Sequence, residues 1–63
     1  MMVDRDRVYT VPRATRETGA PRDMLYAAIA DRSLPAVTRG RVHYFSGAAL
    51  IAFLEHLGER AAS

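Results

Sequence analysis

Arginine is the side chain in this sequence with the clearest chemical meaning. All nine basic residues are arginine, against seven acidic residues. The guanidinium group is a planar fork of several donors that matches the geometry of phosphate groups and guanine edges. A GC-rich genome would produce the same arginine usage through its codons. Composition alone therefore leaves a binding surface and codon bias as two open explanations.

Four residues at the start of one predicted helix form the first candidate surface. Arg22 opens this helix, where its side chain can reach a guanine edge or a phosphate. Asp23 interacts favourably with the helix dipole and can also accept a hydrogen bond from a cytosine amino group. Tyr26 points outward, either to contact phosphate or base or to pack against the hairpin that follows. The small side chain of Ala27 allows this face to approach DNA closely, or it simply reflects the high helix propensity of alanine.

A second group of candidates lies at the tip of a predicted β-hairpin. Arg39 and Arg41 flank Gly40, and arginines at such a tip can enter a minor groove or contact phosphate. A solvent-exposed turn would carry the same residues. Together with the helices described below, DNA contact is the interpretation that we favour.

Three further residues near the start of the chain complete the predicted contact set. Arg13 and Arg16 fall on the polar side of a short helix, which suits backbone contacts that position a protein without reading sequence. Thr10 precedes this helix as its cap and is included with them. Arg32 sits at a helix C-terminus, where the helix dipole explains it without DNA.

Enzymatic and metal chemistry have little support in the sequence. A chain of 63 residues cannot bury a large cleft, and the lack of cysteine excludes thiolate nucleophiles and cysteine-ligated zinc. His43 has no second ligand at metal-binding spacing. His56 and Glu55 are adjacent and do not share a helix face. We therefore expect no enzyme, no cofactor and no metal site.

Two short helices and a tight break are predicted in the first half of the chain. Thr10 caps a helix that stops at Gly19, because glycine readily adopts the left-handed conformation that ends helices. Pro21 then starts a second helix, from about Arg22 to Arg32. Two helices joined by a three-residue turn containing glycine are typical of a helix-turn-helix.

A β-hairpin and a third helix are predicted in the second half. Residues 36–45 are rich in β-branched and aromatic side chains around Gly40, which we place in a left-handed position beside a bulge. Ser46 caps the third helix, and Gly58 ends it. This order of elements predicts an α+β fold, mainly α, of the minimal winged helix-turn-helix type.

The predicted organisation is one domain with two short extensions. We expect a flexible arm over residues 1–8, a folded domain over 9–57 and a short tail over 58–63. The longest apolar run, residues 48–54, is far too short for a membrane span, and no signal peptide is visible. The expected location is the cytoplasm.

The spacing of many small motifs together resembles a known family. The matching residues cover about 9–57 and are Tyr9-Thr10-Val11, Ala14, Gly19, Leu25-Tyr26, Ile29, Leu34-Pro35-Ala36-Val37, Gly40-Arg41, Phe45-Ser46, Ala49-Leu50 and Ala52-Phe53-Leu54. In this spacing the chain resembles the excisionases, or recombination directionality factors, which are small MerR-like winged helix-turn-helix proteins.

The resemblance implies a sequence-specific architectural protein that performs no covalent chemistry. Its second helix would enter the major groove of double-stranded DNA, and its wing would follow the neighbouring minor groove or backbone. Several copies would bind repeated sites side by side, bend attachment-site DNA and direct a tyrosine-type integrase toward excision. A small MerR-like transcriptional regulator is the alternative within the same fold. A protein-interaction module that never touches DNA is the alternative from another class.

The predicted wing departs from the family pattern at two positions. Val42 and Tyr44 stand where relatives are often basic. This change shifts phosphate contact toward the hairpin tip or exposes an apolar surface for a neighbouring protein. Ile51 on the third helix could serve the same purpose. The positive charge nevertheless concentrates in residues 8–46, where six arginines face three acidic residues.

Overall fold

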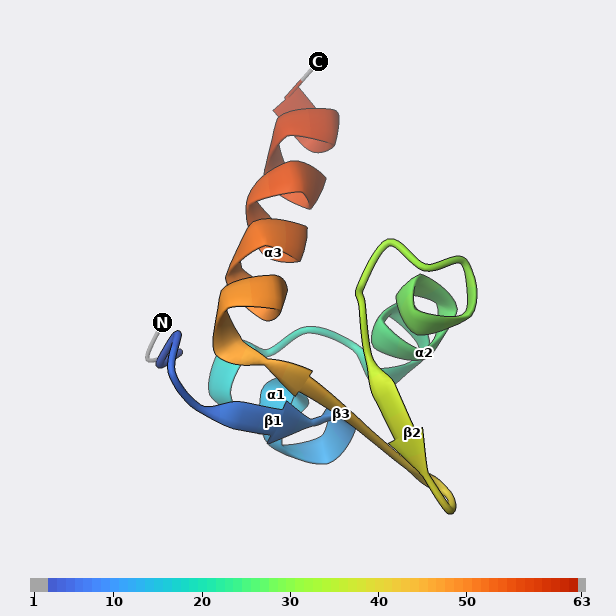
Figure 1. Cartoon of the computed structure of the whole chain (residues 1–63). Coiled ribbons are helices and arrows are strands. Elements are labelled where there is room, and N and C mark those ends of the chain that lie inside the picture. Colours follow the sequence, from blue (N-terminus) through green and yellow to red (C-terminus); the bar gives the residue numbers. More distant parts are fainter. Residues whose placement is uncertain (1–2, 63) are drawn as a thin grey trace.

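Three helices and one antiparallel sheet make up the structure (Figure 1). It is a computed structural model that describes residues 3–62. The elements are β1 (Val8–Thr10), α1 (Val11–Thr18), α2 (Arg22–Ala30), β2 (Val37–Arg39), β3 (Val42–Ser46) and α3 (Gly47–Ala62). The strands lie in the order β1-β3-β2. The predicted α+β, winged helix-like fold is therefore confirmed.

The first two helices form the predicted pair around a glycine turn. Gly19 has a φ of 77° and its N–H donates to the carbonyl oxygen of Thr15 at 2.8 Å, which ends α1 where the sequence predicted. Thr10 occupies the position before α1, but its side chain makes no capping hydrogen bond. The second helix ends at Ala30, two residues before the predicted end, because Arg32 adopts a left-handed φ of 68°.

The hairpin of β2 and β3 is regular up to its tip. Thr38 lies opposite His43 and Arg39 opposite Val42, which leaves Gly40 and Arg41 as a two-residue turn. Gly40 has the expected positive φ, at 61°. The predicted bulge is wrong, because the pairing shows no extra residue on either strand. Glycine at the first turn position is typical of a type II′ turn, which needs no bulge.

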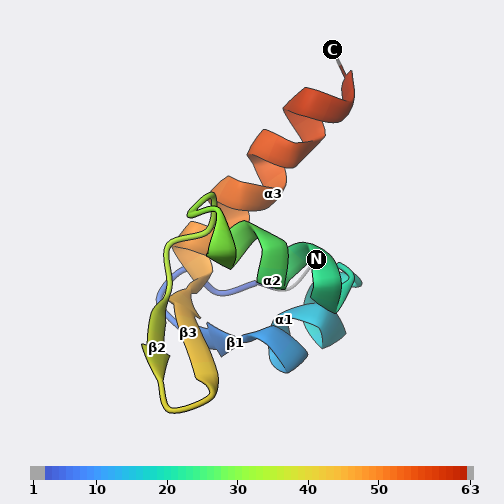
Figure 2. The ribbon, with the colours of Figure 1, turned by 90° about the vertical axis from the view of Figure 1, so that its right-hand side faces the viewer.

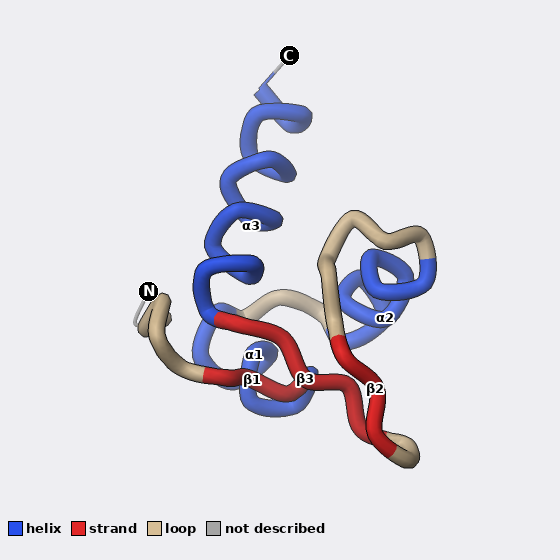
Figure 3. Tube along the Cα trace, viewed as in Figure 1, coloured by secondary structure: helices blue, strands red, loops and turns tan. Residues whose placement is uncertain are grey.

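A third strand, β1, was not predicted. It pairs with β3 in antiparallel register, with Tyr9 opposite Phe45, and runs directly into α1 (Figure 3). Its three residues are too few to show an alternating pattern, and its partner lies far along the chain. The strand closes the sheet on the side opposite β2.

The segment before β1 is attached to the fold. The backbone N–H of Asp4 donates to the Tyr9 hydroxyl at 2.7 Å, and the N–H of Gly47 donates to the Arg7 carbonyl oxygen at 2.8 Å. Val3 packs against the core. The prediction of a flexible arm over 1–8 is therefore wrong for residues 3–8, while Met1 and Met2 lie outside the described residues.

The third helix begins as predicted and ends later. Ser46 accepts a hydrogen bond from the N–H of Ala49 at 3.0 Å, which is the capping contact expected of it. The backbone stays helical through Gly58 to Ala62, so the predicted end and the separate tail over 58–63 are wrong as far as Ala62. A single glycine costs a helix only about 1 kcal/mol, which is too little to stop it. Figure 2 shows α3 projecting from the rest of the molecule.

One apolar core connects the three helices with strands β1 and β3. Val11, Leu25, Leu34 and Leu50 have their side chains almost fully buried, and Tyr9 and Phe45 add aromatic rings from the inner face of the sheet. No polar or charged residue of the described chain is buried in this core. Because α1, α2 and the sheet share it, the core holds the helix-turn-helix in a fixed position against the wing.

Candidate nucleic-acid interface

The outward face of α2 carries the side chains that the sequence assigned to it. Leu25 and Ala28 are buried, so Asp23, Tyr26 and Ala27 are turned to solvent on the other side. Arg22 is exposed in the first turn, ahead of Tyr26 by four residues. The structure thus confirms that these four candidates are accessible from outside.

Tyr26 contacts the wing and remains accessible. Its ring meets the ring of His43 edge-to-face, with 5.9 Å between the centroids and 68° between the planes. The side chain is still 45% exposed. Of the two roles proposed from the sequence, packing against the wing is therefore observed, and a contact with DNA stays a prediction.

His43 is the residue of this region that sequence analysis missed. It lies on the inner face of β3, where Nδ1 is 2.8 Å from the Thr38 hydroxyl on β2. The ring thus joins both strands of the wing to Tyr26 on α2. A contact between residues seventeen positions apart leaves no local signal in the sequence.

A groove unites the helix-turn-helix with the wing. It has a volume of about 180 Å³ and is lined by residues from β1, α1, α2 and the hairpin, namely Thr10, Val11, Pro12, Tyr26, Arg41, Val42 and His43. A second depression, of about 410 Å³, adjoins it and brings in Arg13, Arg16 and Glu17. The two share Thr10 and Pro12. Each of the three groups predicted from the sequence therefore contributes at least one residue to these adjoining depressions, namely Tyr26, Arg41, Thr10, Arg13 and Arg16.

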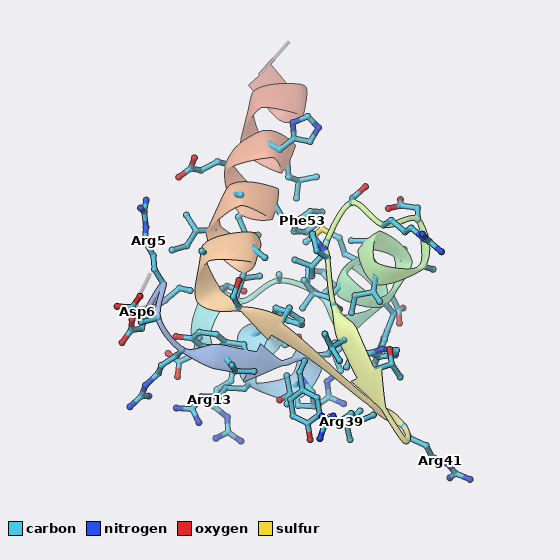
Figure 4. All side chains as sticks on the ribbon, viewed as in Figure 1. Arg5, Asp6, Arg13, Arg39, Arg41 and Phe53 are labelled. Atoms are coloured by element: carbon cyan, nitrogen blue, oxygen red, sulfur yellow. The ribbon has the colours of Figure 1, made fainter. Side chains whose placement is uncertain are left out.

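The two arginines of the hairpin have different positions. Arg41 belongs to the turn, projects from the tip and lines the groove beside Tyr26 (Figure 4). Arg39 ends β2 opposite Val42, so its side chain lies on the outer face of the sheet, the face opposite His43. Gly40 between them supplies the turn. Arg41 is therefore the more direct neighbour of α2.

The five candidate arginines are free to bind an anion. In the part of the chain that the structure describes, no ion pair or hydrogen bond engages the guanidinium groups of Arg13, Arg16, Arg22, Arg39 and Arg41, all of which are exposed. Binding a phosphate therefore breaks no contact within the protein.

The outer face of the sheet carries most of the exposed large apolar side chains of the described chain. Among the described residues, four of the five exposed large apolar side chains lie there, namely Val8, Val37, Val42 and Tyr44. A shallow depression of about 360 Å³ runs over this face beside Pro35 and Ala36. The exposed apolar surface that Val42 and Tyr44 indicated is present, and Val8 and Val37 extend it. Ile51 is half-buried on α3 and adds nothing to it.

The contact between Tyr26 and His43 is expected to couple the stability effects of their replacement. In a double-mutant cycle with Tyr26→Leu and His43→Val, urea unfolding should give a coupling of about 0.5–1.5 kcal/mol, as found for aromatic pairs. The loss of the Thr38 hydrogen bond cancels in the cycle. The control pairs Tyr26→Leu with Tyr44→Val on the outer face, where no coupling is expected. Equal coupling in both cycles would show that the ring contact contributes nothing of its own.

The part of the chain that the structure describes contains neither a metal-binding group of side chains nor a membrane-spanning helix. Its histidine, aspartate and glutamate side chains form no group of three that could hold a metal ion. None of its helices combines the length and apolar character needed to cross a membrane. Comparison of the chain with protein-family models, with curated proteins and with solved structures gave no match.

Proposed function

We propose that this protein binds double-stranded DNA. One observation carries the proposal: Tyr26 of α2, Arg41 of the wing and the start of α1 line a single groove, with unengaged arginines on its rim. A helix beside a projecting hairpin suits the major groove of DNA together with the adjacent backbone or minor groove.

Each residue of the surface has a task in this arrangement. Arg22 and Asp23, in the first turn of α2, read base edges or contact phosphate, and Ala27 lets the helix approach closely. Tyr26 contacts phosphate or base from the helix side of the groove, and Arg41 does so from the wing side. The remaining contacts, to the backbone, come from Thr10, Arg13, Arg16, Arg39 and the turn at Gly40.

The biological role that we propose is that of an excisionase. Copies of the protein would bind repeated sites cooperatively in the cytoplasm, bend attachment-site DNA and direct a tyrosine-type integrase toward excision. This part of the proposal depends on the resemblance of the sequence to that family. A small transcriptional regulator of the MerR-like type would use the same residues. Footprinting separates the two, since several adjacent protected sites with enhanced cleavage between them indicate bending, and one isolated site indicates a regulator.

The wild-type protein is expected to lose DNA affinity steeply as salt rises. If the five candidate arginines each neutralise one phosphate, a plot of the logarithm of the association constant against the logarithm of the salt concentration should have a slope of about −4.5. Fluorescence anisotropy with a labelled duplex measures this slope. Absence of binding to any duplex at low salt would reject DNA binding altogether.

A second candidate function is protein interaction without DNA. The observation that favours it is the apolar outer face formed by Val8, Val37, Val42 and Tyr44, because contiguous exposed apolar patches often mark partner sites. This candidate expects Arg22→Ala and Arg39→Ala to leave function intact. The DNA-binding proposal expects both to weaken it.

A further inference from the structure

Arg32 adopts a backbone conformation that normally belongs to glycine. With a φ of 68°, it is the only residue other than glycine with positive φ in the described chain. It follows α2 directly after the capping residue Asp31. For a side chain with a Cβ atom this conformation costs about 1 kcal/mol relative to glycine.

The fold explains the conformation but not the choice of arginine. The left-handed turn lets the N–H of Arg32 donate to Ile29 at 3.3 Å and the N–H of Leu34 donate to Ala28 at 3.1 Å. It thereby brings Leu34 back into the core, where the side chain is fully buried. Glycine would make the same turn with less strain, as it does at most helix ends of this kind.

The helix dipole, which accounted for Arg32 in the sequence, does not require arginine here. A cation in the last turn of α2 would interact with the dipole without backbone strain, yet that turn contains no basic residue. No ion pair or hydrogen bond holds the guanidinium of Arg32 within the described chain, and the residue is exposed. Within the described chain, the arginine side chain itself therefore makes no contact that offsets the strain.

A depression at the end of α2 lies between Arg32 and the wing. Arg32 borders a depression of about 380 Å³ that also includes Ile29 of α2 and Thr38 of β2. This is the side of α2 that faces the wing, as the contact between Tyr26 and His43 shows. Arg22 begins α2 and Arg32 lies two residues beyond its end, so the nine residues of the helix, about 13 Å long at a rise of 1.5 Å per residue, separate the two arginines. The major groove is about 12 Å wide, so its two phosphate backbones match this separation.

From these observations we infer that Arg32 binds a backbone phosphate of DNA, on the strand across the major groove from the one that Arg22 contacts. The inference rests on the proposed DNA binding and adds a phosphodiester contact at the far end of α2. The arginine is kept at a strained position because its charge is needed there.

Replacing Arg32 with glycine tests the inference, because stability and binding should change in opposite directions. Arg32→Gly should raise the melting temperature by several degrees, since it relieves the strain. It should weaken duplex binding about eightfold at 0.1 M salt and reduce the magnitude of the salt slope by about 0.9, as expected for one lost phosphate contact. Arg32→Lys keeps the charge and should retain most of the wild-type affinity.

A matched control removes one positive charge elsewhere. Arg5 is exposed in the N-terminal segment, away from the hairpin tip (Figure 4). Arg5→Gln should therefore leave the salt slope unchanged. If Arg32→Gly is stabilised but binds with the wild-type affinity and slope, the inference is overturned while the proposed function stands. If the wild-type protein binds no duplex at low salt, the proposed function fails first, and the inference with it.

Discussion

Gly47→Ala is expected to lower the free energy of unfolding by about 2 kcal/mol, within the range seen when a methyl group is forced into a packed site. A Cβ atom at this position would overlap the carbonyl group of Asp4 and lie 3.0 Å from Cε1 of Tyr9. The backbone of Gly47 does not have positive φ, so the conformation itself accepts alanine. The steric overlap therefore outweighs the better helix propensity of alanine, and the substitution is destabilising.

This loss is large for a chain of 63 residues, whose total stability should be about 3–9 kcal/mol. The melting temperature should fall by about 10 °C, measured by circular dichroism. A variant without residues 1–6 provides the control, because it lacks the Asp4 carbonyl group. There, Gly47→Ala should be neutral or stabilising. If alanine destabilises both proteins equally, the N-terminal segment is not the cause.

The double variant Arg22→Gln, Arg41→Gln is expected to bind duplex DNA about 60-fold more weakly than the wild type at 0.1 M salt. The two residues belong to different elements, α2 and the hairpin turn, so each should contact its own phosphate or base. The magnitude of the salt slope should fall by about 1.8. Anisotropy titrations at four or more salt concentrations give both quantities.

Arg5→Gln, Arg7→Gln is the matched control for this loss, since it removes the same charge from the exposed N-terminal segment. Its affinity should fall much less, through long-range electrostatics alone. Equal losses in the two double variants would mean that net charge governs binding and that the groove beside Tyr26 has no particular part in it.

The predictions that succeeded depend on signals within a few residues of the element concerned. Gly19 ends α1 because a left-handed residue is needed there, and Ser46 begins α3 because its hydroxyl reaches the N–H of Ala49. The inward residues of α2 follow from helical periodicity alone. Exposure of Arg22 and Tyr26 follows in turn, so most of the candidate interface on α2 could be read from the sequence.

The predictions that failed depend on partners far along the chain or on small energy differences. β1 exists because Tyr9 pairs with Phe45, and three residues beside a helix give no pattern of their own. Gly58 stays helical because one glycine is a weak stop signal. Packing of Tyr26 against the wing was one of two open roles, and the sequence could not decide between them because the contact with His43 needs the whole hairpin to be folded back on α2. Proximity of this kind is a property of the tertiary structure.

The pairing of β1 with β3 determines how the protein unfolds. Val8 lies opposite Ser46, so the helix-turn-helix and the wing are both enclosed in the loop that this pairing closes. Closing such a loop is entropically costly, and the cost is recovered only when the enclosed elements pack. Folding should therefore be all-or-none, and those amide protons of β1 that are hydrogen-bonded to β3 should exchange with solvent only through global unfolding. A nick in either enclosed element would release α2 and the wing together.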